Sequence, residues 1–142
     1  MSRRYALLRI GKKFADEMIA HTREEDPDEC CGILSGADDS VAKLYRIKNA
    51  TPSPYRYSME PQEFLEAMLD SERNDWEMLA FYHSHTHSPA YPSQTDVRLA
   101  VDSWMLDVLY ILVSLEDKEA PQIRAFQITE DGEIVEQQFE LT

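Results

Sequence analysis

The sequence predicts an α/β (α+β) fold in which a single mixed β-sheet is flanked by helices. Short apolar or alternating segments, typical of strands, interleave along the chain with segments whose apolar residues recur every three or four positions, typical of helices. Such interleaving favours one sheet covered by helices. The length of 142 residues fits one domain, so we expect residues 1–142 to fold as a single domain.

The N-terminal part of the chain predicts three strands and one helix. The strands fall at residues 5–10, 31–35 and 41–48, where apolar or alternating residues run between polar breaks and turn-forming residues. After the first strand, Phe14 and Met18 lie four positions apart on one stripe. This spacing predicts a helix that packs against the sheet.

The rest of the chain predicts two more helices alternating with strands. Pro61 suits the first turn of a helix. In a later helix the apolar residues recur at i, i+3, i+4 and i+7, and this stripe is expected to face the core. It consists of Val97, Ala100, Val101 and Trp104. Strands are expected at residues 77–82, 108–115, 122–129 and 133–141. The last two form a hairpin, because Glu130-Asp-Gly132 is a turn signal.

The charge of the chain excludes two classes of partner. Twenty-seven acidic residues against 14 basic ones give a formal net charge of −13. A nucleic-acid binder needs a clustered basic face, and an anionic membrane attracts basic segments, so we expect neither partner. Three interpretations of the acidity stay open: an ordinary solvated surface, adaptation to a high-salt cytoplasm, or attraction to a basic partner. The first is the default, and adaptation is favoured over attraction to a partner because the acidic excess extends to the C-terminal hairpin. The oligomeric state is not predicted.

The cysteines and the hydropathy predict a cytoplasmic location. Cys30 and Cys31 are adjacent and form no disulfide framework. The N-terminal residues lack the apolar core of a secretion signal, and the longest apolar run, residues 104–113, is too short to cross a bilayer. We therefore expect a reduced cytoplasmic protein in which Cys31 belongs to the core, while the role of Cys30 is left open.

The residues that carry chemistry follow the strand at 77–82. In an extended chain alternate side chains share a face, so His83 and His85 project together. Two converging imidazoles suit a zinc ion, and Asp96, eleven residues beyond His85, supplies a third ligand if the loop between them folds back. Two histidines and one carboxylate leave the fourth position open for water, as in catalytic zinc sites.

Each part of this pattern also has an ordinary structural interpretation. Ser93-x-x-Asp96 before an apolar helix is a capping signal, which is compatible with a role at a metal site because a cap fixes both side chains. His-x-His alone is weak evidence. The joint spacing His-x-His-x7-Ser-x2-Asp, placed between a strand and a helix, is much more specific.

With a second motif, Glu29-Cys-Cys-Gly-Ile-Leu34, the sequence resembles the JAMM (MPN+) family of zinc-dependent metallopeptidases and isopeptidases. The resemblance implies a compact domain with the layered architecture of cytidine deaminases and one Zn2+ ion with a bound water. It implies His83, His85 and Asp96 as zinc ligands. It also implies Glu29 as general acid/base and Ser93 as the residue that steadies the tetrahedral intermediate.

Neighbouring residues show one departure from the family and no further ligand. Many members have proline after the second histidine, where this chain has Thr86. His87 could compete as a ligand by alternation, but the family gives it no role, and we expect it to face solvent. His21 has no partner visible in the sequence and is expected at the surface.

The resemblance implies a zinc-dependent hydrolase that cleaves a peptide or isopeptide bond at or near the C-terminus of a small ubiquitin-like or sulfur-carrier protein. The alternative is a non-catalytic MPN-type scaffold that binds other proteins, against which the retained motif residues argue. A zinc deaminase requires His-x-Glu and a downstream Pro-Cys-x-x-Cys, and neither occurs here. Helical His-Glu-x-x-His is also absent.

Overall fold

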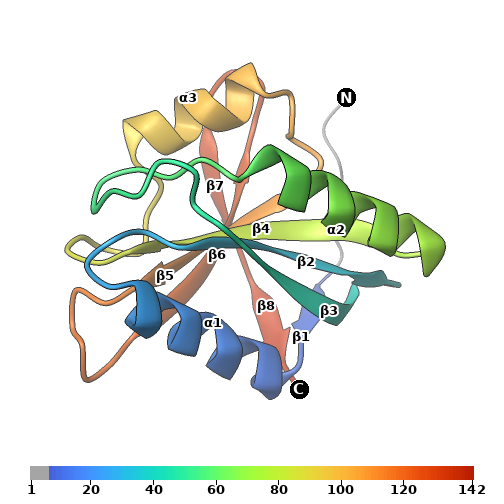
Figure 1. Ribbon diagram of the computed structural model, residues 1–142, viewed down its shortest axis with the longest axis horizontal. Helices are drawn as coiled ribbons and strands as arrows, with labels where there is room; N and C mark the ends of the chain where they lie inside the picture. The colour runs from blue at the N-terminus through green and yellow to red at the C-terminus, as the bar shows by residue number, and fades with distance from the viewer. Residues whose placement is uncertain (1–6) are drawn as a thin grey trace.

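The computed structural model describes residues 7–142 and contains one eight-stranded mixed sheet with three helices. One helix covers one face of the sheet and the other two cover the opposite face, which confirms the predicted fold class (Figure 1). The helices are α1 (Lys12–Glu25), α2 (Pro61–Arg73) and α3 (Gln94–Asp102). The strands are β1 (Leu8–Ile10), β2 (Cys31–Ala37), β3 (Ser40–Ile47), β4 (Glu77–His85), β5 (Leu109–Ser114), β6 (Gln122–Ile128), β7 (Ile134–Gln137) and β8 (Phe139–Leu141).

The strand order β7-β6-β5-β4-β2-β3-β1-β8 places β4 in the middle of the sheet. This strand pairs antiparallel with β2 and parallel with β5. The register sets Cys31 of β2 opposite His83 of β4. The start of β2 and the end of β4 therefore lie side by side, and the two sequence motifs meet at one end of these central strands.

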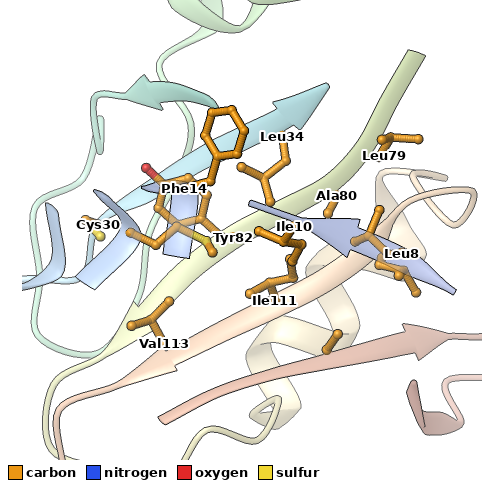
Figure 2. Close-up of a cluster of buried hydrophobic side chains, with 13 residues drawn as sticks. Leu8, Ile10, Phe14, Cys30, Leu34, Leu79, Ala80, Tyr82, Ile111 and Val113 are labelled. Carbon is orange, nitrogen blue, oxygen red and sulfur yellow. The ribbon is translucent and has the colours of Figure 1, made fainter. Parts of the chain in front are cut away.

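Alternation along β2 and the residue before it, Cys30, divides the core between the two faces of the sheet. Cys30 and Leu34 pack on the side of α1, whereas Cys31 and Ile33 pack on the side of α2 and α3. Figure 2 shows the first of these clusters, in which side chains from β1, α1, β2, β4 and β5 come together. In the described part of the chain no helix is long and apolar enough to cross a membrane.

Gly32 in the second motif is required by close packing. Its partner across the sheet is Tyr82, whose ring lies directly over the glycine. A Cβ at position 32 would overlap that ring and the carbonyl oxygen of Tyr45. The absence of a side chain therefore allows the Tyr82 ring to lie flat across β2 and to reach α1.

Two predictions about elements are wrong, and one lies partly outside the described residues. The predicted helix does not reach Trp104: α3 ends at Asp102, and Trp104 has a φ of 59° and is 81% exposed. The predicted strand 133–141 divides at Gln138 into β7, which pairs with β6, and β8, which pairs with β1 at the other edge. Phe139 packs against the core there. The first two residues of the predicted strand 5–10 are not described.

His21 is buried, contrary to the expected surface position. It lies on α1, and its Nδ1 is 2.7 Å from the hydroxyl oxygen of Tyr82. Burial, together with the positive charge of Arg46, lowers the pKa of His21 to about 4, while Glu24 acts in the opposite direction. The sequence could not show this partner, because Tyr82 is 61 residues away in the chain.

We expect acid to destabilise the protein partly through His21. Because its pKa is about 4 in the folded chain and 6.5 ordinarily, the unfolded state binds the proton first, and stability falls as the pH drops through 6.5 and levels off below about 4. A His21→Gln variant lacks this contribution. In urea denaturation, its loss of unfolding free energy between pH 7 and pH 4 should be roughly 3 kcal/mol smaller than that of the wild type. His87→Gln, at an exposed site, should behave as wild type; the same behaviour in His21→Gln would contradict the assignment.

Candidate metal centre

His83 and His85 project from the last residues of β4 toward the same side. Both are buried, and their rings meet edge to face with centroids 5.1 Å apart. Ser84, between them, points to the other side, where its Oγ accepts a hydrogen bond of 2.8 Å from the backbone N–H of Cys30. Alternation within β4 therefore delivers two imidazoles to one place, as the sequence predicted.

Asp96 reaches the same place from the first turn of α3. Its Oδ2 accepts a hydrogen bond from the backbone N–H of Ser93 at 2.9 Å, and the Ser93 Oγ accepts one from the Asp96 N–H at 3.0 Å. This is a complete capping box. The same Oδ2 lies 3.0 Å from Nε2 of both His83 and His85. The capping interpretation and the ligand interpretation of Ser93-x-x-Asp96 thus coexist in one geometry.

We call His83, His85 and Asp96 the His–His–Asp cluster. One ligand atom from each lies within 4.8 Å of the others, and within residues 7–142 no other group of three such side chains meets this condition. Zinc–nitrogen distances of 2.0–2.1 Å in a tetrahedron place neighbouring ligand atoms roughly 3.3 Å apart. The two separations from Asp96 Oδ2 to the histidine Nε2 atoms, 3.0 Å each, are close to this value.

The hydrogen bonds around His85 also favour a cation in the cluster. Its Nδ1 lies 2.9 Å from the carbonyl oxygen of Pro89, which only accepts, so Nδ1 carries the proton. A protonated His85 donates from Nε2 to the Asp96 carboxylate, 3.0 Å away, whereas the neutral ring turns a lone pair of Nε2 toward it. His83 makes no hydrogen bond through either ring nitrogen, although both are buried. A metal ion would satisfy these facing acceptors, so the residues present fit a divalent cation.

The pKa values in the cluster follow from the same contacts. Burial acts to raise the pKa of Asp96, but the charge of His83 and the hydrogen bonds from His85 and Ser93 outweigh it and hold the pKa far below its usual range. Burial acts to lower the pKa of His85, but its bonds to Asp96 and Pro89 raise it overall. Asp96 is therefore a carboxylate and a ready ligand.

Glu29 lies just before β2, close enough to His85 and Asp96 for their charges to affect it. Its side chain is 4% exposed and its Oε1 has no hydrogen-bond partner. Burial raises the pKa of Glu29 to about 8; the charge of His85 lowers it and that of Asp96 raises it. A buried carboxyl with a free oxygen and a pKa near neutrality is suited to proton transfer.

The remaining residues singled out from the sequence are also placed. Ser93 is exposed, and because its Oγ accepts from Asp96, its hydroxyl proton is available to a ligand. His87 is exposed and contacts Thr86 instead of joining the cluster. Thr86 donates to the carbonyl oxygen of Pro27, so the residue that replaces the family's proline ties the loop after β4 to the segment before Glu29.

Cys30 is buried, and its Sγ lies 3.5 Å from the hydroxyl of Thr22. Burial raises the pKa of its thiol, which disfavours the thiolate that a nucleophile or a zinc ligand needs. Both cysteines are free and buried. The open question about Cys30 is thereby answered: it is a core residue.

Sequence reasoning missed Tyr57, whose ring stacks on that of His83 with centroids 4.4 Å apart and an angle of 25°. It belongs to the connection between β3 and α2, where the sequence predicted neither a helix nor a strand. Two tyrosines, Tyr55 and Tyr57, within this otherwise polar segment were the available signal. Nothing in the sequence indicated which of them turns inward.

The chain is similar in sequence and in fold to several known proteins. The sequence model for prokaryotic homologs of the JAB domain matches residues 11–129. The CysO-cysteine peptidase of Mycobacterium tuberculosis is 36% identical over 133 residues, covering 92% of this chain and 88% of the relative. The probable TtuB-protein conjugate cleaving protease of Thermus thermophilus is 31% identical over 129 residues, covering 90% of this chain and 80% of the relative. A solved structure from Desulfitobacterium hafniense, 37% identical, superposes with a TM-score of 0.83 over 96% of this chain and 93% of that one.

Proposed function

Because this chain belongs to the family of prokaryotic homologs of the JAB domain, we propose that it is a zinc-dependent peptidase that cleaves a peptide or isopeptide bond at or near the C-terminus of a small ubiquitin-like or sulfur-carrier protein. One observation carries this proposal: the nitrogens of His83 and His85 converge on a single oxygen of Asp96, with the buried carboxyl of Glu29 nearby. Binding of a partner protein alone requires none of these features.

In this function His83, His85 and Asp96 hold the zinc ion. When bound, zinc lowers the pKa of a water molecule and polarises the scissile carbonyl. The capping box keeps Asp96 aimed at the histidines, and Pro89 keeps the Nε2 lone pair of His85 directed inward. The chain thus holds three ligands before the metal arrives, which limits the reorganisation that binding requires.

Glu29 moves the proton. Its carboxylate accepts a proton from the attacking water and delivers it to the leaving nitrogen, as a general base and then a general acid. Burial raises the pKa of Glu29, whereas a cation in the cluster lowers it, so both forms of the carboxyl are accessible near neutral pH. Ser93, with its hydroxyl proton free, donates to the oxyanion that develops on the scissile carbonyl.

The substrate class is supported by the relatives. One is named as a peptidase of CysO-cysteine and another as a probable protease of TtuB-protein conjugates. This chain covers 88% of the first relative and 80% of the second. We therefore propose a small carrier protein with a flexible C-terminus as the partner, cleaved at or near that C-terminus.

A hydrolysis panel tests the reaction and the partner together. Folded ubiquitin-like carriers bearing one extra C-terminal amino acid, or joined to a lysine by an isopeptide bond, are incubated with the protein. We expect release from at least one carrier, detected by mass spectrometry, abolition by a zinc chelator, and restoration by added zinc. Stoichiometric zinc with no cleavage of any carrier would contradict the peptidase; a protein that binds no zinc at neutral pH would contradict the metal site.

Glu29→Gln separates proton transfer from metal binding. Because Glu29 is proposed to move protons and not to hold zinc, the variant should bind one zinc ion yet lose roughly 10²–10⁴-fold in kcat. Glu25→Gln makes the same chemical change at an exposed residue, the last of α1, and should keep wild-type kcat. Zinc loss in Glu29→Gln, measured by elemental analysis after dialysis, would instead assign Glu29 as a ligand.

A further inference from the structure

His83 is held less by hydrogen bonds than its neighbour. Its imidazole is 1% exposed, yet neither ring nitrogen has a hydrogen-bond partner among the described residues. His85 is anchored through Nδ1 to the carbonyl of Pro89. Metal-binding histidines usually have such an anchor, because it fixes the orientation of the ring. Apart from the approach of Nε2 to Oδ2 of Asp96 at 3.0 Å, the orientation of His83 depends on packing.

The ring of Tyr57 supplies that packing. It lies nearly parallel to the imidazole of His83, at 25° and with centroids 4.4 Å apart, while His85 meets the same imidazole at 66°. The His83 ring is thus confined by one stacked and one edge-on contact. Rotation about its χ2 bond would disturb the stack with Tyr57 and turn Nε2 away from Asp96.

The loop that carries Tyr57 is fixed at its base by Asn49. The Oδ1 of Asn49 accepts hydrogen bonds of 3.0 Å from the backbone N–H groups of Thr51 and Ser58. The Nδ2 of the same residue donates at 3.0 Å to the carbonyl oxygen of Glu29. One side chain therefore ties together the loop that orients His83 and the segment that presents Glu29.

We propose that Tyr57 is a positioning residue whose aromatic ring, stacked on His83, sets the affinity of the His–His–Asp cluster for zinc. This inference rests on the proposed function for the identity of the metal. The ring carries the effect and the hydroxyl does not, because the contact with His83 is made face to face. Asn49 fixes the loop that carries Tyr57 and also bonds to the carbonyl oxygen of Glu29. The position of Tyr57 is therefore linked both to His83 and to the segment of Glu29.

Zinc affinity, measured by competition with a chromophoric chelator, tests the inference without reference to catalysis. Tyr57→Leu keeps an apolar side chain but removes the ring, and should weaken zinc binding about tenfold. Tyr57→Phe should bind within about twofold of the wild type, because it keeps the ring. The matched control is Tyr55→Leu, in the same loop, where the ring is 80% exposed and no change is expected.

A second readout needs no metal. In NMR spectra of the metal-free protein, the ring protons of His83 should show an upfield ring-current shift that Tyr57→Phe keeps and Tyr57→Leu loses. If circular dichroism shows that Tyr57→Leu is unfolded, the Tyr57→Met variant is used in its place. The flexible methionine side chain fills the same space without a ring.

Wild-type zinc affinity in the folded Leu or Met variant would overturn the inference, as would a Phe variant as weak as Leu. A wild-type protein that binds no zinc would instead contradict the proposed function, while the NMR shifts would still decide whether Tyr57 orients His83.

Discussion

The site depends on one oxygen atom. Oδ2 of Asp96 lies 3.0 Å from the Nε2 atoms of two buried imidazoles, and it also accepts the backbone N–H of Ser93. Because Pro89 takes the only proton of a neutral His85, the atoms that face each other are mostly acceptors. Buried acceptors in this arrangement are unfavourable without a proton or a cation between them. A divalent metal ion bound between these three atoms would satisfy all of them.

The fold serves to bring these atoms together from distant positions in the sequence. The end of β4 lies beside the start of β2, so Glu29 approaches the histidines, and Ser84 fixes the contact by bonding the Cys30 N–H. Gly32 lets the strands pass beneath the ring of Tyr82. The capping box then returns Asp96 to the histidines from eleven residues away. Each of these contacts is local, but together they restrict the positions of the His83, His85 and Asp96 side chains.

The elements and the cluster could be predicted because local rules govern them. Alternation places His83 and His85 on one side of β4, and a serine three residues before an aspartate predicts the cap of α3. What failed depends on contacts between distant residues. The burial of His21 requires Tyr82, and the stacking of Tyr57 on His83 requires the loop that Asn49 closes. The division of the last strand at Gln138 likewise requires β1, with which β8 pairs at the other edge of the sheet.

X-ray absorption at the zinc edge of the zinc-loaded protein tests the central claim most directly. We expect four nitrogen or oxygen scatterers at about 2.0–2.1 Å, with the outer-shell signals of two imidazoles, from His83 and His85, and the remainder from Asp96 and water. His83→Ala should lose one imidazole signal, whereas His87→Ala should keep both. A sulfur scatterer at about 2.3 Å, from Cys30 or Cys31, or an unchanged spectrum in His83→Ala, would contradict the assignment.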